Sequence, residues 1–156
     1  MSVEVGSKAP EFTLPNQDKQ PVSLSSSSGK TVILAFFPAA FTSVCQKELC
    51  HFRDDLSSLG ASNATVYGIS VDTPFTLKEF RKQNSLEFDL LSDFNKDAIQ
   101  KYDVVNPDMG GLKGISKRAV FVIDRTGVIR YREVTPTPGD EPNYAKVHEV
   151  VDGLKS

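Results

Sequence analysis

The chain of 156 residues has no tryptophan and only two methionines, two histidines and two cysteines. A structural zinc site needs four ligands, so both histidines, His51 and His148, would have to join the two thiols. So small a number of ligands disfavours such a site. We therefore expect no metal. A domain of this length buries enough surface to fold without disulfides, so the two cysteines are candidates for chemistry rather than for cross-linking.

A large charge of one sign is also missing. Eighteen basic and 20 acidic residues give a net charge of -2, which does not favour nucleic acid or an anionic membrane as a partner. Residues 1–8 lack the basic cluster and apolar run of a signal peptide, and the longest apolar stretch, 32–41, is far shorter than the ~20 residues that span a bilayer. We expect one cytoplasmic domain over residues 1–156.

Strand and helix patterns alternate along the chain. Apolar runs predict buried strands over three segments, and a turn at Asp124–Gly127 predicts a hairpin between the last of them and a fourth: 32–37, 65–71, 119–123 and 128–134. Helical spacing predicts one helix face made of Cys45, Leu49, Phe52, Leu56 and Leu59. Two further helices are predicted, one opening at Thr73-Pro74 and one bearing Tyr144, Val147, Val151 and Leu154. This order predicts an α/β fold with a mixed central sheet and helices on both faces.

Cys45 follows the first long strand, at the edge of an α/β sheet where ligands bind. Ser43 and Gln46 fit a capping box, which would make Cys45 the second residue of a helix. Unpaired backbone N–H groups and the helix dipole would then favour the thiolate, which is the reactive form. The alternative is that Cys45 only fills the apolar stripe of the helix.

Cys50 stands five positions after Cys45. In an intact helix this spacing places the two Cα atoms about 8.6 Å apart. A disulfide needs roughly 4.4–6.8 Å, so the pair cannot bridge unless the first turns unwind. The alternative is that Cys50 is an incidental cysteine on the flank of the helix.

Several segments together carry a family resemblance. The pattern Pro38-x-x-x-Thr42-x-x-Cys45 resembles the active-site signature of the peroxiredoxins, which are thiol peroxidases. The opening segment 6–14, the strand segment 67–72 and the later segments 90–93 and 118–124 resemble family landmarks in the same order, so the likeness covers nearly the whole chain. The resemblance implies a thioredoxin-like fold and reduction of hydroperoxides.

The same resemblance implies roles for individual residues. Cys45 would be the peroxidatic nucleophile, Thr42 would offer its hydroxyl to the peroxide and the thiolate, and Pro38 would shield the site. Arg118 would stabilise the thiolate and the polarised peroxide, a role suited to a side chain that stays charged. Glu48 falls where relatives carry a glutamate that steadies this arginine, although an exposed helix acid is an equal reading.

The sequence resembles two different groups within this family. Cys45-x-x-x-x-Cys50 is similar to the bacterioferritin comigratory protein group, in which the second cysteine resolves the first. Phe37-Pro38, 40–42 and Cys45-Gln46 look closer to the alkyl hydroperoxide reductase E group, which lacks that cysteine. Cys50 therefore either forms an intrachain disulfide with Cys45 or takes no part.

The expected partners are a hydroperoxide and a thioredoxin-like or glutaredoxin-like reductant, with no organic cofactor, in a monomer or a homodimer. A redox sensor or partner-binding module with the same cysteine chemistry is a second hypothesis. A general thiol–disulfide oxidoreductase is a third, and the absence of Cys-x-x-Cys weighs against it. His51 could be a proton donor, but an exposed helix histidine with no partner is the favoured reading.

Overall fold

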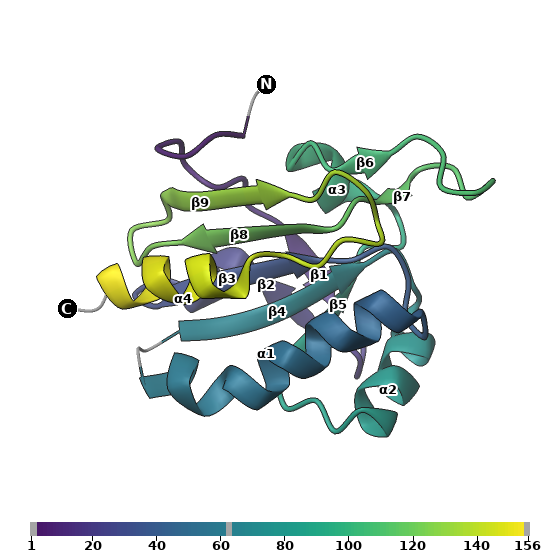
Figure 1. Ribbon diagram of the computed structural model, residues 1–156, viewed down its shortest axis with the longest axis horizontal. Helices are drawn as coiled ribbons and strands as arrows, with labels where there is room; N and C mark the ends of the chain where they lie inside the picture. The colour runs from purple at the N-terminus through teal and green to yellow at the C-terminus, as the bar shows by residue number, and fades with distance from the viewer. Residues whose placement is uncertain (1–2, 62–63, 155–156) are drawn as a thin grey trace.

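A computed structural model describes residues 3–61 and 64–154, with the side chains of 56–61 excepted. The elements run in the order β1 (Thr13–Pro15), β2 (Pro21–Ser23), η1 (Leu24–Ser27), β3 (Thr31–Phe36), α1 (Ser43–Ala61), β4 (Ala64–Ser70), α2 (Pro74–Gln83), β5 (Asp89–Ser92), α3 (Asp97–Lys101), β6 (Val105–Asn106), β7 (Ile115–Ser116), β8 (Ala119–Ile123), β9 (Ile129–Val134) and α4 (Tyr144–Gly153) (Figure 1). None of the helices in this described part is long and apolar enough to cross a membrane.

The central sheet is mixed, as predicted. Its five strands lie in the order β5-β4-β3-β8-β9, with β3, β4 and β5 parallel and with β8 antiparallel to both β3 and β9. All residues of β3 and β8 are buried, which fits their uninterrupted apolar sequences. The predicted hairpin is confirmed as β8–β9, and the four predicted strands agree with β3, β4, β8 and β9 to within one residue at each end.

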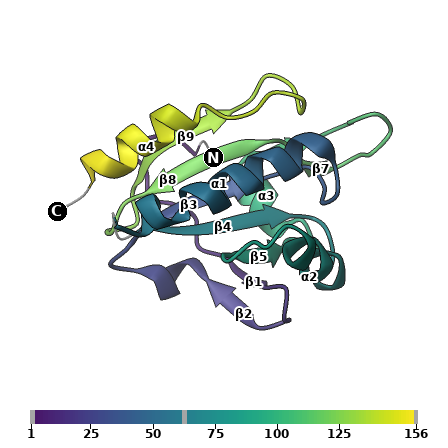
Figure 2. The same cartoon turned by 60° about the horizontal axis from the view of Figure 1, so that its bottom comes forward.

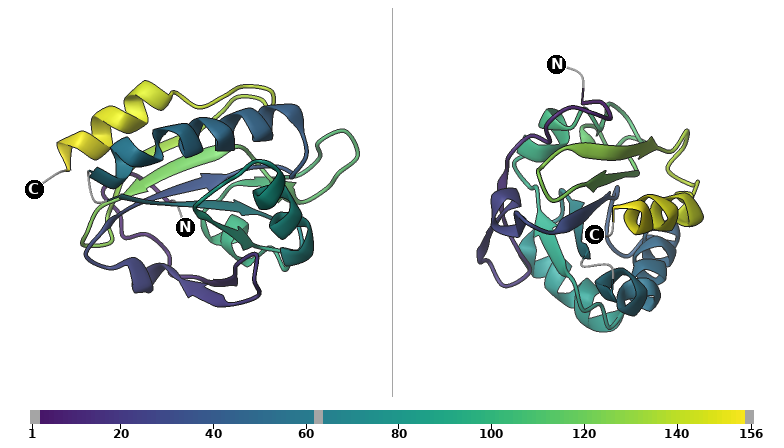
Figure 3. Two further views of the ribbon diagram at one scale, coloured as in Figure 1. Left: turned by 90° about the horizontal axis from the view of Figure 1, so that it is seen from below. Right: turned by 90° about the vertical axis from the view of Figure 1, so that its left-hand side faces the viewer.

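Two apolar cores lie on opposite faces of this sheet. On one face α1, α2 and α4 supply Leu49, Phe80 and Val147, among others. On the other face the segment before β1 supplies Phe12 and α3 supplies Ile99, together with residues of β1 and others. Figure 3 shows α1 and α4 side by side over one face and the β1–β2 hairpin across the other. The predicted α/β architecture with helices on both faces is therefore confirmed.

The predicted helices form where their patterns indicated. Thr73 caps α2 by accepting a hydrogen bond from the Thr76 N–H, and Pro74 is its first residue. Asn143 caps α4, and Leu154 is its C-terminal cap rather than a helical residue. On α1 the predicted core positions Cys45, Leu49 and Phe52 are buried, whereas the side chains of Leu56 and Leu59 lie outside the described part of the chain.

Candidate active site

The site lies where β3 gives way to α1, at the edge of the sheet where the parallel strands end. Figure 2 shows the start of α1 beside α2, above the arrowheads of β4 and β5. The connecting segment 37–42 is held there by β4: the Phe37 N–H donates to Ile69 O over 2.9 Å, and the Ala40 N–H donates to Asp72 Oδ2 over 2.8 Å. The location predicted for the cysteine chemistry is therefore an anchored loop followed by a helix start.

The helix begins one residue earlier than the predicted capping box requires. Ser43 is already helical, and the Gln46 N–H donates to Thr42 O over 2.9 Å, so Thr42 is the cap position and Cys45 is the third helical residue. Phe41, directly before the cap, has φ 66°, a left-handed conformation that bulky residues rarely adopt. This sharp turn ends the incoming segment and shifts the helix start from the position that the Ser43–Gln46 pattern suggests.

Cys45, Arg118 and Glu48 meet beneath the first turns of α1. Arg118 Nη2 donates to Cys45 Sγ over 3.0 Å, and Arg118 Nη1 donates to Glu48 Oε1 over 3.1 Å. Cys45 and Glu48 are 0% exposed and Arg118 is 2% exposed. Arg118 Nε donates to Pro138 O over 3.0 Å, which fixes the plane of the guanidinium. A buried cation is thus aimed at the sulfur from a position just before β8.

Glu48 is not the exposed helix acid that the alternative reading expected. It lies one turn after Cys45 on the inner side of α1 and pairs with Arg118. Burial raises the pKa of Glu48 to about 8, against the lowering effect of Arg118 and with the negative charges of Glu141 and Glu133 adding to the rise. Its second carboxyl oxygen, Oε2, is buried without a hydrogen-bond partner in the described structure.

Thr42 and Pro38 occupy the loop that leads to Cys45. Thr42 is exposed and its hydroxyl donates to Ala39 O over 2.9 Å, which leaves the oxygen lone pairs free to accept. Pro38 is buried two residues after the end of β3. The structure thus brings Cys45, Arg118 and Glu48 into contact and keeps Thr42 at the surface side of the same turn.

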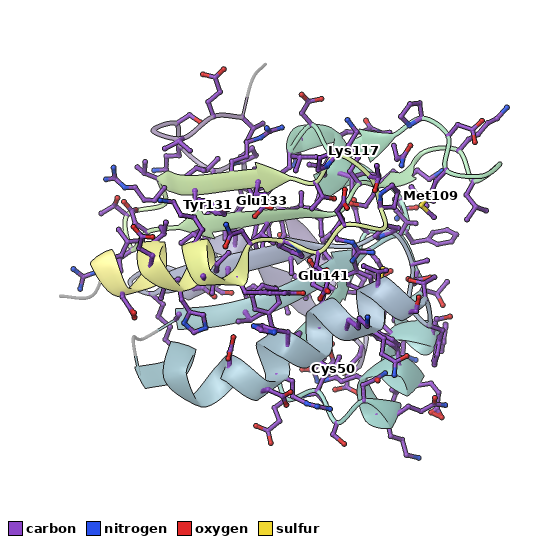
Figure 4. The ribbon with its side chains drawn as sticks, viewed as in Figure 1. Cys50, Met109, Lys117, Tyr131, Glu133 and Glu141 are labelled. Carbon is purple, nitrogen blue, oxygen red and sulfur yellow. The ribbon has the colours of Figure 1, made fainter. Side chains whose placement is uncertain are left out.

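Cys50 sits on a different side of α1 from Glu48. Figure 4 shows Cys50 on the edge of α1 that faces away from Glu141. It is half-buried, and its Sγ lies 3.7 Å from Oδ1 of Asn84, the residue that ends α2. Both cysteines are free thiols within one continuous helix. The described state is therefore the reduced, helical one, in which the predicted geometry keeps the two cysteines apart.

Sequence reasoning missed Asp72, Pro138 and the partners of His51. Asp72 anchors the loop before α1, and its only signal was its place just after β4. Pro138 acts through its backbone carbonyl, which no side-chain pattern reveals. His51, predicted to have no partner, lies 3.0 Å from Asp55 Oδ2 and stacks on the Tyr144 ring with centroids 3.7 Å apart. His51 is therefore a contact between α1 and α4.

The same Asp55 oxygen lies 2.9 Å from His148 Nε2 of α4, so both histidines of the chain converge on one carboxylate. Across the described ranges 3–61 and 64–154, no group of three or more His, Cys, Asp or Glu residues has an arrangement that could hold a metal ion. The convergence therefore serves to join the two helices.

Residues 5–132 match the AhpC/TSA family. The chain is 41% identical over 141 residues to alkyl hydroperoxide reductase E of Mycobacterium tuberculosis, which covers 88% of this chain and 89% of the relative. It is 43% identical over 132 residues to a putative peroxiredoxin bcp of Coxiella burnetii, with 83% of this chain and 87% of the relative covered.

Solved structures of peroxiredoxins share this fold, which is thioredoxin-like, as the resemblance implied. A peroxiredoxin-like protein from Aquifex aeolicus superimposes with a TM-score of 0.90 at 30% identity, covering 99% of this chain and 89% of that one. Peroxidoxin BcpB from Mycobacterium tuberculosis gives a TM-score of 0.88 at 28% identity, covering 99% of both chains. With the thiol, the guanidinium and the anchored loop in one place, these matches make the chain a member of the AhpC/TSA family, a thiol-dependent peroxidase of the peroxiredoxin type.

Proposed function

We propose that Cys45 is the peroxidatic cysteine, that it reduces hydrogen peroxide and organic hydroperoxides, and that Cys50 resolves the oxidised form. The observation that supports this best is the 3.0 Å contact between Arg118 Nη2 and Cys45 Sγ in a buried site. A guanidinium held against sulfur stabilises the thiolate, which is the nucleophile toward the O–O bond.

The first step forms an S–O bond and breaks the O–O bond. Cys45 Sγ attacks the terminal peroxide oxygen, sulfur is oxidised by two electrons to the sulfenic acid, and water or an alcohol leaves. Negative charge then develops on the leaving oxygen. Arg118 supplies donors to the reacting oxygens, and the free lone pairs of Thr42 Oγ1 supply an acceptor. Pro38 shields the thiolate side of the loop, and Glu48 holds Arg118.

The second step requires local unwinding of α1. Cys50 Sγ attacks the sulfenic sulfur, a disulfide forms and water leaves. One contact bears on such an opening: Cys50 Sγ meets Asn84 Oδ1, at the end of α2, over the long distance of 3.7 Å. Directly after Cys50, His51 and Asp55 dock on Tyr144 and His148 of α4. In this proposal residues 43–50 open, which takes Cys45, Glu48 and Leu49 out of their buried positions, while the helix from His51 onward stays attached.

The disulfide is then reduced by thiol–disulfide exchange with a thioredoxin-like or glutaredoxin-like donor, in a compartment such as the cytoplasm that keeps such donors reduced. This cycle uses only sulfur chemistry and needs no organic cofactor. Hydroperoxide substrate and a thioredoxin-type reductant are what the peroxiredoxin family suggests for this chain.

Two measurements test the assignment. Stopped-flow mixing of Cys45→Ser with peroxide should show no peroxide consumption, with Cys50→Ser as the matched control that still reacts once. Intact mass under non-reducing conditions, after one equivalent of peroxide, should show the loss of two hydrogens in the parent protein. Stable addition of one oxygen to the parent would instead establish a one-cysteine peroxidase, and rapid turnover by Cys45→Ser would refute the role of Cys45.

A redox sensor is separated from a peroxidase by repeated turnover. With a reductant supplied, the parent protein should consume many equivalents of peroxide. If consumption stopped after about one equivalent, the sensor would be favoured, because a sensor stays in its oxidised form and is not reduced again for another turnover.

A further inference from the structure

The buried site has one fixed positive charge and two acids. Arg118 faces Cys45 through Nη2 and Glu48 through Nη1, and all three side chains are almost completely closed to water. If thiol and carboxyl were both ionised, the closed site would carry a net negative charge. If only one is ionised, the site is neutral, and burying an unbalanced charge is costly. The arrangement therefore favours one proton held jointly by Cys45 and Glu48.

The surroundings of Glu48 favour the carboxyl as the place for that proton. Its Oε2 is buried without a partner, and an ionised oxygen left in that way would be more costly than a neutral one. Two further acids are near enough for their charges to act on Glu48: Glu133 on β9 and Glu141 in the segment before α4, both labelled in Figure 4. Both are held by donors, since Tyr131 OH donates to Glu133 Oε1 and Tyr144 OH donates to Glu141 Oε1, each over 2.7 Å.

These neighbours act in one direction. Carboxylates that accept hydrogen bonds from tyrosine and, for Glu133, from the Asn143 N–H are stabilised as anions, and their field disfavours a third anion at Glu48. Among the described residues, Arg118 is the only cation that forms an ion pair with Glu48. Its other terminal nitrogen, Nη2, is taken by Cys45. A thiolate at Cys45 therefore leaves Glu48 as the neutral member of the pair.

We propose that Glu48 stores the proton that Cys45 gives up, and releases it when oxidation removes the negative charge from sulfur. This rests on the proposed role of Cys45 as the peroxidatic cysteine. The balanced step is Cys45–S⁻ plus ROOH plus Glu48–COOH giving Cys45–SOH plus ROH plus Glu48–COO⁻. The S–O bond forms with the terminal oxygen, which keeps its hydrogen, and the O–O bond breaks. The departing RO⁻ becomes ROH with, in net terms, the proton of Glu48.

This exchange keeps the charge of the closed site at zero before and after oxidation. In the reduced protein Arg118 is balanced by the thiolate, and in the oxidised protein it is balanced by the Glu48 carboxylate. Glu48 is accordingly a positioning residue for Arg118 that also carries a proton. Oxidation then proceeds without taking a proton from solution, although thiolate oxidation by itself consumes one.

The experiment uses Cys50→Ser, which holds Cys45 at the sulfenic acid, with one equivalent of hydrogen peroxide near neutral pH. Difference infrared spectra should show a protonated carboxylic acid in the reduced form and its loss on oxidation. A pH indicator in weak buffer should show no proton uptake. With Glu48→Gln added, the infrared band should be missing and one proton should be taken up for each sulfenic acid formed. Glu79→Gln, at an exposed site on α2, is the matched control and should behave like the parent.

Other outcomes decide against the proposal. One proton taken up with Glu48 in place, and no carboxylic acid band in the reduced form, would mean that Glu48 is an anion throughout and only holds Arg118. A band that persists after oxidation would mean that Glu48 keeps its proton throughout and that the proton on the leaving oxygen comes from another source. Failure of peroxide to form any sulfenic acid on Cys45, read from the intact mass, would instead overturn the proposed function on which this inference rests.

Discussion

Arg118 donates from Nη2 to Cys45 Sγ over 3.0 Å while its Nη1 and Nε are engaged by Glu48 and Pro138. The forked guanidinium is thus used in three directions at once. Lysine keeps the charge but presents its donors from a single nitrogen, so Arg118→Lys cannot hold the sulfur and both anchors. We expect its second-order rate constant with hydrogen peroxide to fall about 10²- to 10³-fold, as for loss of a transition-state donor, measured by stopped flow.

Arg125→Lys is the control for this change, because Arg125 is exposed in the β8–β9 turn. It should react like the parent. If Arg118→Lys also reacted like the parent, a diffuse positive charge would be sufficient and the directed contact with Cys45 would have no catalytic weight.

Asp72 anchors the loop that carries Pro38 and Thr42 and leads to Cys45. Its Oδ2 accepts from the Ala40 N–H over 2.8 Å and from Ser70 Oγ over 2.7 Å. Asp72→Ala leaves the Ala40 N–H without this acceptor and frees the loop, and we expect a roughly 10- to 100-fold slower reaction with peroxide. Asp72→Asn keeps an acceptor oxygen and should retain most of the rate. Equal rates for both variants, with unchanged circular dichroism, would contradict the anchoring role.

The sheet and its helices were predictable because their signals are local and strong. The runs that became β3 and β8 are apolar throughout, as strands buried on both faces must be. Thr73-Pro74 joins a cap to a first-turn proline and fixed the start of α2. The position of Cys45 after a buried strand marked the edge of the sheet at which Cys45, Glu48 and Arg118 meet.

The surroundings of Glu48 were not predictable, because they depend on residues distant in sequence and on one irregularity. Arg118 lies 70 positions away, and its contact follows from β8 pairing with β3. In β9 a register shift opposite Val122/Ile123 breaks the usual alternation, so Ile129 and Tyr131 pack into opposite cores. Period-2 patterning cannot foresee this shift, which places Tyr131 and Glu133 on the face of α1.

The first residue of α1 was not predictable for a different reason. Ser43 and Gln46 satisfy the sequence pattern of a capping box, yet the cap is Thr42. The local residues suit either start, and the choice depends on Asp72 holding Ala40 and on the left-handed turn at Phe41. A one-residue shift of this kind is set by tertiary contacts rather than by propensity.

Asp124 should contribute stability that disappears in acid. It accepts from the Val128 N–H, Thr126 Oγ1 and Arg130 Nε in the β8–β9 turn. Partial burial opposes ionisation, but these hydrogen bonds outweigh it and lower the pKa of Asp124 from 3.8 to about 2. Because the folded pKa is depressed, the stabilisation is complete above the unfolded value and is lost as pH falls from 3.8 through about 2.

Urea unfolding of the parent and Asp124→Asn between pH 2 and pH 6 measures this effect, with about one pH unit between samples. The free-energy difference between the two proteins should be constant at the upper end and should shrink across the acid window. Asp103→Asn, at an exposed site, is the matched control and should track the parent. A difference that stayed constant down to the lowest pH would mean that the carboxylate charge is not what the turn uses.

Gly68 lets the strand beneath α1 approach its neighbours closely. A Cβ at this position would lie 2.8 Å from Leu90 Cδ2, 3.3 Å from Phe37 Cε1 and 3.5 Å from Leu49 Cδ2. Gly68→Ala therefore overpacks the core under α1, and we expect a loss of about 1–3 kcal/mol in the free energy of unfolding. At this chain length that lowers Tm by about 2–4 °C per kcal/mol. Gly153→Ala, where an added Cβ meets nothing within 4 Å, should leave Tm unchanged or raise it. Equal Tm values for Gly68→Ala and the parent would show that Leu90 can move aside without cost.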